Sequence, residues 1–354
     1  MVTRVSLAAL LAASGLAAQT PERFPLTGAA VAVYNLAGQL RVEAGSGADV
    51  VVEVTRGGRD AAKLKVETGP LRDRPTLRVI YPDDEIYYAG EGGYGNSTLD
   101  VHEDGTFGDD GDHHGGRHSW GDGHRVRISS RGDGLDAHAD LRVLVPAGKR
   151  VAVHLAVGRA TISNVNGDLF VDVSSANVTA TGTKGSLTID AGSGNVDISD
   201  AQGDVDLDTG SGDIRLTGVT GGTVKLETGS GNATGERVQA DVLSVDTGSG
   251  DVEFAAVSSP DVKIDTGSGS VRLTLDAKLT DLDVDTGSGD VTLNVAPTIG
   301  GNIYIDTGSG GIDLGGLTVQ VTKLEKDHVE GKIGAGTGHF KIETGSGEVR
   351  LVKS

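Results

Sequence analysis

The chain lacks cysteine, is poor in aromatic residues and carries a strong excess of negative charge. With no cysteine among 354 residues, disulfides, thiolate metal sites and a lipid anchor on cysteine are excluded. Only 5 Phe, 6 Tyr and 1 Trp are present, which leaves little material for a thick globular core. The formal charge of −19 argues against nucleic acid and anionic membrane surfaces as partners, because both select basic patches.

Long apolar runs are also missing. The N-terminal residues 1–18 combine Arg4, a short apolar run and small residues before Gln19, which is typical of a secretory signal peptide. No later stretch approaches the roughly 20 apolar residues that a membrane-spanning helix requires. We therefore expect an exported protein without a transmembrane helix in the mature chain, located in the periplasm, at the cell surface or outside the cell.

Glycine, in contrast, is abundant, and much of it lies in a phrase that returns at a regular spacing. AGSG begins at Ala191, and TGSG begins at Thr209, Thr228, Thr247, Thr266, Thr286, Thr307 and Thr344. Up to Thr307 successive starts are 18, 19, 19, 19, 20 and 21 residues apart, and the last gap of 37 is close to two steps. Units this short cannot bury a core alone, so the period predicts a stack of repeats.

Each unit contains two short stretches with the alternation of a half-buried strand. In the unit that begins at Val205, apolar and polar residues alternate on both sides of TGSG, and no helical period occurs in this region. Glycines allow tight backbone corners there. The predicted structural corners are Thr209, Gly210, Gly212, Thr228, Gly229, Gly231, Thr247, Gly248, Gly250, Thr266, Gly267, Gly269, Thr286, Gly287, Gly289, Thr307, Gly308 and Gly310.

Two all-β architectures fit this pattern. In a β-solenoid each unit is one coil and equivalent strands stack in parallel, about 4.8 Å apart. In an antiparallel meander TGSG would be a hairpin loop. Near-identical corners favour a β-solenoid (parallel β-helix-like) of roughly 18–21-residue coils, because stacking in register places like residues above like.

The rest of the chain is less regular. We predict an irregular N-terminal β cap over residues 19–82, a flexible insertion rich in Gly, Asp and His over residues 83–124, and the solenoid repeat domain over residues 125–354. Charged residues 323–327 fall where a corner is due and are expected to mark a closing cap.

Several of these motifs together resemble one known family. The sequence has YNLAGQL at Tyr34–Leu40, LVP at Leu144–Pro146 and then serial corners of TGSG followed by Asp. This combination resembles the DUF4097 family, whose members are known as candidate adhesins, from about residue 30 to the end. The resemblance implies a bacterial β-solenoid of the cell envelope with an adhesive role and no catalytic residues. The segment 83–124 departs from the family pattern.

The repeated corners also raise two kinds of chemistry. Asp-Thr-Gly-Ser is the aspartic-protease phrase, but that reaction needs two carboxylates that face each other, whereas these copies follow the repeat spacing. Stacked coils would instead line up their acidic residues, and oxygen-rich edges suit calcium. The weak metal candidates are Asp208, Asp246, Asp265, Asp285 and Asp306 in this row and His113, His114 and His118 in the insertion. A solvated acidic face that gathers ions loosely, and a polar loop, are the plainer interpretations.

The favoured function is therefore a non-enzymatic, exported protein of the cell envelope or surface, adhesin-like or a scaffold. Its partner would be an unidentified envelope or surface ligand, protein or glycan, and we expect no cofactor. The alternative is a calcium-dependent, β-roll-like exported protein. A carbohydrate-active β-helix enzyme is less well supported, because such enzymes use clusters of acidic, basic and aromatic residues in one groove.

Overall fold

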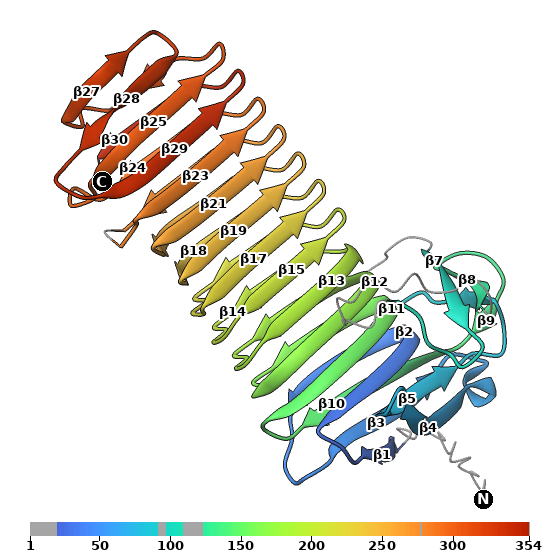
Figure 1. Cartoon of the computed structure of the whole chain (residues 1–354). Coiled ribbons are helices and arrows are strands. Elements are labelled where there is room, and N and C mark those ends of the chain that lie inside the picture. The colour runs from blue at the N-terminus through green and yellow to red at the C-terminus, as the bar shows by residue number, and fades with distance from the viewer. Residues whose placement is uncertain (1–19, 91–96, 109–122, 277, 354) are drawn as a thin grey trace, which may run out of the picture.

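The computed structural model describes residues 20–90, 97–108, 123–276 and 278–353, so the predicted signal peptide lies outside it. Strands dominate these ranges, and helical structure within them is limited to one 3-10 turn, η1 (Ala61–Lys63). The strands build a long stack that runs from the N-terminal elements to a cap near the C-terminus (Figure 1).

The first coils are single long strands. They are β2 (Ala30–Ala44), β11 (Lys149–Ser163) and β12 (Gly167–Thr181), and β11 pairs in parallel with both of the others. The next coil divides, because the first half of β12 pairs with β13 (Leu187–Ser193) and its second half pairs with β14 (Val196–Ser199). Each coil thus has two sides, which form two parallel ladders along the stack.

The regular coils follow, each with one strand on either side of its TGSG corner. One ladder continues through β15 (Val205–Thr209), β17 (Thr223–Thr228), β19 (Val242–Thr247), β21 (Asp261–Thr266) and β23 (Asp281–Thr286). The other continues through β16 (Ile214–Thr217), β18 (Ala233–Gln239), β20 (Val252–Ser258), β22 (Val271–Leu275) and β24 (Val291–Val295). Every strand pairs in parallel with its equivalents in adjacent coils. The predicted all-β solenoid is confirmed.

The core of the stack is a set of aliphatic rows. Register places Leu207 beside Leu226, followed by Val245 and Ile264, and all four are buried. Burying an aliphatic side chain of this size stabilises the fold by about 1.5–3 kcal/mol relative to exposing it. Repetition of this one row supplies much of the core that the chain's scarce aromatic residues do not.

Near the C-terminus the order of coils in space departs from the order in sequence. The last strands, β29 (Gly338–Thr344) and β30 (Val349–Lys353), stack directly on β23 and β24. The earlier strands β25 (Gly301–Thr307) and β26 (Ile312–Asp313) lie beyond them, so β29 is seen between β23 and β25 (Figure 1). An antiparallel hairpin of β28 (His328–Ile333) and β27 (Val319–Leu324) then closes the stack on β25.

At the N-terminal end, two strands from distant parts of the chain substitute for one coil. β5 (Arg74–Ile80) pairs with the first half of β2, and β10 (His138–Val145) pairs with its second half. Antiparallel strands β4 (Lys65–Leu71), β3 (Val50–Gly57) and β1 (Glu22–Leu26) extend this end. A separate sheet contains β6 (Glu85–Tyr87), β7 (Ser97–His102), β8 (Gly123–Ser129) and β9 (Leu135–Asp136).

The structure therefore divides the chain differently from the sequence-based boundaries. The stack begins with β2, inside the predicted cap, whereas β8 and β9 belong to the separate sheet although residues 125–354 were assigned to the solenoid. Strands also occupy part of the segment 83–124, for which a flexible insertion is predicted. The pairing of β10 with β2 joins residues about a hundred positions apart, and no local repeat in the sequence indicates it.

Candidate functional site: two rows at the TGSG corners

At each TGSG corner, the threonine side chain points into the stack and the side chain of the acidic residue before it points outward. In β19, Asp246 and Thr247 are adjacent, and strand alternation directs their side chains to opposite faces. Thr247 is completely buried, whereas Asp246 is exposed. The same alternation in the other coils generates an inner row of threonines and an outer row of carboxylates.

The inner row consists of threonines whose hydroxyls connect successive coils. The Thr247 Oγ1 accepts a hydrogen bond from the Gly250 N–H (3.0 Å) and donates one to the Gly231 carbonyl of the adjacent coil (3.1 Å). The same pair of bonds is made by Thr228, Thr266, Thr286 and Thr344. Each hydroxyl thus provides a hydrogen-bond partner for one buried backbone N–H and one buried backbone C=O at its corner.

The second glycine of each corner is required by the closeness of the next coil. A Cβ atom on Gly250 would overlap the Gly231 carbonyl oxygen, and one on Gly269 would overlap that of Gly250. The first glycine is also tightly packed, since a Cβ on Gly248 would overlap the Gly229 carbonyl. The residues predicted as corners therefore lie where coils approach most closely.

The outer row is longer than the sequence indicates and differs in order. Register places its members beside one another in the order Asp172, Asp190, Asp208, Glu227, Asp246, Asp265, Asp285, Glu343 and Asp306. All five predicted aspartates belong to it, but Glu343 separates Asp285 from Asp306. Asp172 was not among the predicted candidates, although it precedes Asp190 by 18 residues, one coil length.

Mutual repulsion is visible in the electrostatics of this row. The pKa of Asp208 is raised by partial burial and by the negative charges of Glu227 and Asp206. The pKa of Asp285 is raised by partial burial and by Asp265 and Glu343. At these two positions, partial burial first and neighbouring carboxylates second therefore disfavour ionisation.

Lysines relieve the repulsion at two places. The Lys225 Nζ lies 2.8 Å from a Glu227 oxygen, and the Lys341 Nζ lies 2.6 Å from a Glu343 oxygen. Both lysines project from the outer face two residues before the acid that they contact. Arg272 lies on the other ladder, 3.9 Å from Glu253, and does not contact this row.

A histidine stands at each end of the row. His154 Nδ1 is 3.0 Å from Asp172 Oδ2, and its buried ring stacks on Tyr34 with centroids 4.1 Å apart. Phe107, from the segment predicted as an insertion, contacts both rings edge-on. His154 was not among the predicted site residues, although it precedes Asp172 by one coil length.

At the far end, His328 in β28 terminates the row. Its Nδ1 lies 2.9 Å from Asp306 Oδ2 and its Nε2 lies 2.9 Å from Glu330 Oε1. The pKa of His328 is raised by these two hydrogen bonds, and the one to Asp306 has the larger effect. No repeat spacing indicates this pairing, because β28 adds to the stack in the antiparallel direction.

A second polar row just after the corners has a structural role. Asn232 Oδ1 accepts the Asp251 N–H of the next coil (2.9 Å), and Asp213 Oδ1 accepts the Asn232 N–H (2.9 Å). Asn177, Asn195, Asp251 and Asp290 act in the same way. One oxygen of each side chain is therefore already engaged in joining coils.

The described residues contain no group of three or more His, Asp or Glu side chains arranged to hold a metal ion. His113, His114 and His118 lie outside the described residues. A calcium ion in proteins takes six to eight oxygen ligands, whereas the outer row offers carboxylates in a single line. Its geometry suits loosely held cations shared between coils better than one closed coordination sphere.

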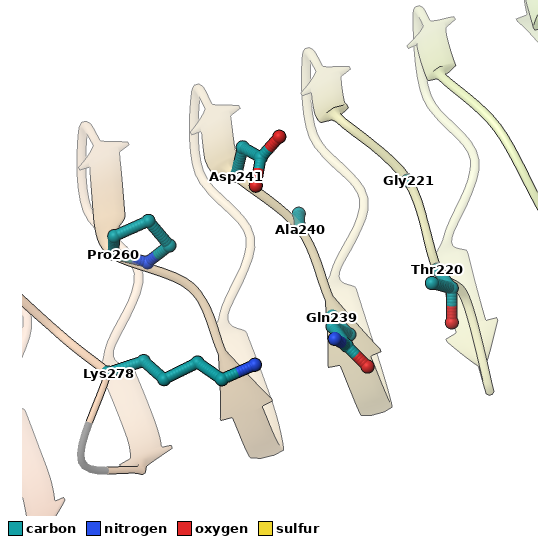
Figure 2. A pocket seen from close by; sticks show the side chains of 7 residues that line it. All are labelled: Thr220, Gly221, Gln239, Ala240, Asp241, Pro260 and Lys278. Atoms are coloured by element: carbon teal, nitrogen blue, oxygen red, sulfur yellow. The ribbon is translucent and has the colours of Figure 1, made fainter.

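One open hollow of about 350 Å³ lies elsewhere, at the opposite corners of consecutive coils. Figure 2 shows Lys278 reaching from its own coil toward Gln239, across the coil that carries Pro260. Asp241 points away from Lys278 in this view. The hollow brings together side chains of mixed charge, without a convergent pair of acidic groups.

Comparison with known proteins agrees with this coil geometry. Residues 171–352 match the family model described as Toastrack DUF4097, and this range covers the regular coils and the intercalated C-terminal coil. The chain belongs to the DUF4097 family. A comparison of this DUF4097 chain with curated proteins finds no match.

Among solved structures, the chain is similar to a candidate cell adhesion protein from Clostridium sporogenes. The two share 9% identity, the alignment covers 94% of this chain and 100% of the other, and the TM-score is 0.18. Within the described residues of this DUF4097 protein, no helix is long and apolar enough to cross a bilayer.

Proposed function

We propose that this DUF4097 protein is a non-enzymatic, exported protein that acts at the cell envelope or surface as an adhesin-like scaffold. The observation that carries the proposal is the uninterrupted row of nine carboxylates, one on each successive coil from Asp172 to Asp306. Family membership and the signal-like residues 1–18 support it.

A stiff row of equal charges is suited to multivalent contact. Coils about 4.8 Å apart extend the nine carboxylates over about 40 Å. Each carboxylate alone binds a cationic group weakly in water, but many contacts made together raise the overall affinity. The partner is a surface or envelope ligand, protein or glycan, that carries cationic groups in series.

The arrangement of the acidic groups favours binding over catalysis. The Asp-Thr-Gly-Ser aspartates lie in one line along the stack, with Glu227 between Asp208 and Asp246 and Glu343 between Asp285 and Asp306. An aspartic protease needs two carboxylates that share one proton, and a glycosidase needs two that flank the scissile bond. A row that presents carboxylates on the eight coils beyond the buried Asp172 is instead a repetitive contact surface.

The cellular location is tested by treating intact cells with protease, beside a known periplasmic protein as control. Cleavage of this protein while the control survives would place it at the surface. Protection until the envelope is opened would indicate an internal scaffold and contradict the adhesive role. Recovery in the cytoplasm, with residues 1–18 retained, would contradict export altogether.

The role of the row is tested by replacing Asp208, Asp246, Asp265 and Asp285 with Asn. We expect this variant to lose most of its retention on surfaces that carry amines, and to keep its fold. A matched control changes four acids outside the row, Asp197, Glu236, Glu253 and Asp313, to their amides. Equal loss in both variants would show an effect of net charge alone and contradict a dedicated row.

Calcium dependence is the second candidate, and the raised pKa values of Asp208 and Asp285 favour it. Divalent cations between neighbouring carboxylates would relieve the repulsion. We expect calcium to raise the unfolding temperature of the wild type more than an equal ionic strength of sodium does, and a chelator to reverse the gain. An unchanged temperature in calcium and chelator would exclude this candidate without affecting the scaffold proposal.

A further inference from the structure

The large apolar side chains that are exposed in the described residues lie at one end of the molecule. They are Tyr304 (37% exposed), Val321 (43%) and Leu324 (67%). Val321 and Leu324 belong to β27, and Tyr304 belongs to β25, which β28 joins to β27. The C-terminal cap thus exposes apolar side chains that the acidic coils lack, Val321 and Leu324 on β27 and Tyr304 two strands away on the other face of the sheet.

β27 is an open edge of the stack. It pairs with β28 on one side, and its residues from Gln320 to Leu324 are exposed. A strand of this kind presents unpaired backbone N–H and C=O groups, which form a template for another strand. Apolar side chains beside such groups favour protein as the occupant, because both kinds of surface are then buried together.

The charge of the cap favours a second copy of this chain as the protein that pairs with β27. Residues 319–333, which contain β27 and β28, carry three lysines and three acidic residues and are therefore neutral apart from His328. The whole chain has a charge of −19, so two copies repel each other over most of their surfaces. The cap is a surface at which a second copy can approach without that cost.

We infer that β27 pairs in antiparallel fashion with β27 of a second copy, which gives a tail-to-tail dimer with two-fold symmetry. With the axis at Thr322, residues 320–324 of the two strands lie opposite one another, and Lys323 of each copy lies opposite Val321 of the other. No like charges are then directly opposite. A symmetric pairing of this kind closes on itself and does not propagate into a filament.

Two features of β27 limit the strength of this pairing. Its register on β28 shifts between Val321 and Lys323, which marks a bulge, and Lys323 itself is charged. Bulges and edge lysines weaken edge-to-edge association. The dimer is therefore expected to be reversible and to dissociate on dilution. The inference is independent of the function proposed for the carboxylate row.

Sedimentation velocity of the full chain over a dilution series tests the inference. We expect a mass twice that of one chain at high concentration and the mass of one chain after dilution. The double variant Val321→Lys and Leu324→Lys should remain monomeric throughout, because it opposes like charges across the axis. The control variant Ser186→Lys and Ala255→Lys, with the same change in net charge on the coils, should dimerise like the wild type. A wild type that is monomeric at every concentration, or a dimer that persists in the cap variant, would overturn the inference.

A single introduced cysteine gives a second measurement, since the chain has none of its own. Thr322→Cys places the thiols of the two copies at the axis, where strand spacing permits a disulfide. Under mild oxidation we expect disulfide-linked dimers from Thr322→Cys and none from Ala255→Cys. Equal crosslinking of both variants would indicate random collision and count against the proposed axis.

Discussion

The inner and outer rows of the corners are built from adjacent residues and have opposite effects on stability. In the inner row, the Thr247 hydroxyl is buried and makes two hydrogen bonds between coils. In the outer row, Asp285 lies between Asp265 and Glu343, and its carboxyl has a raised pKa. Repetition in register therefore multiplies a favourable contact on one side of the strand and an unfavourable one on the other.

This difference shows which row the fold needs. A threonine row lowers the free energy of the stack and is accounted for by structure alone. The carboxylate row adds unfavourable repulsion at Asp208 and Asp285, and the function proposed above would account for its regular occurrence. The aliphatic and threonine rows offset the unfavourable contribution of the carboxylates to the free energy of folding.

The largest expected effect comes from adding one methyl group to a corner glycine. Gly250→Ala would drive its Cβ into the Gly231 carbonyl oxygen, so the two coils must separate. We expect a loss of about 3 kcal/mol or more in the free energy of unfolding, measured by urea denaturation. Gly311→Ala is the control, because no atom lies within 4 Å of the Cβ that it adds. Equal stability of the two variants would contradict the close packing of the corners.

Next in size is the loss of one hydroxyl in the same row. Thr247→Val keeps the shape but leaves the Gly250 N–H and the Gly231 carbonyl without their partner. We expect a loss of about 2 kcal/mol and faster hydrogen exchange of the Gly250 amide. The control is Thr188→Val on the outward face of β13. If exchange at Gly250 stays unchanged, the hydroxyl is not what protects that corner.

Neutralising one member of the outer row should have the opposite sign. Because Asp285 has a raised pKa in the fold, its ionisation costs stability, which falls as the pH rises from the usual aspartate range through the raised value. Asp285→Asn should remove that fall and stabilise the protein at neutral pH by on the order of 0.5 kcal/mol, less at high salt. Asp197→Asn serves as control and should give no gain, because the strand register places Asp197 beside the opposite charge of Arg215. Destabilisation by Asp285→Asn would contradict the repulsion.

The smallest effect concerns the histidine that ends the row. The pKa of His328 is raised in the fold by Asp306 and then Glu330, so its contribution is complete below its ordinary pKa of about 6.5 and is lost as the pH rises through the raised value. The protection of the β28 amides, after correction for the intrinsic rise of exchange with pH, should therefore fall above about pH 6.5 in the wild type. His328→Gln should show no such step, and a step that survives the substitution would assign it to another group.

The two ends of the molecule differ in how far the sequence predicts them. Between Ala191 and Thr286 each coil follows the last in sequence and in space, so the spacing alone predicts the rows. AGSG also occurs at residues 44–47, but there it follows β2 and leads into the antiparallel strand β3. The same letters thus form a coil corner only where flanking strands repeat at coil spacing.

The sequence by itself determined the all-β solenoid, the corners and most of the acidic row. Those features follow from alternation and from a period of about 19 residues, which act between neighbouring coils. Only the tertiary structure decided that Glu343 enters between Asp285 and Asp306, that His154 and His328 end the row, and that β2 opens the stack. Those contacts join segments far apart in the chain. They depend on which strand edges of the assembled stack remain free to pair, and no single repeat contains that information.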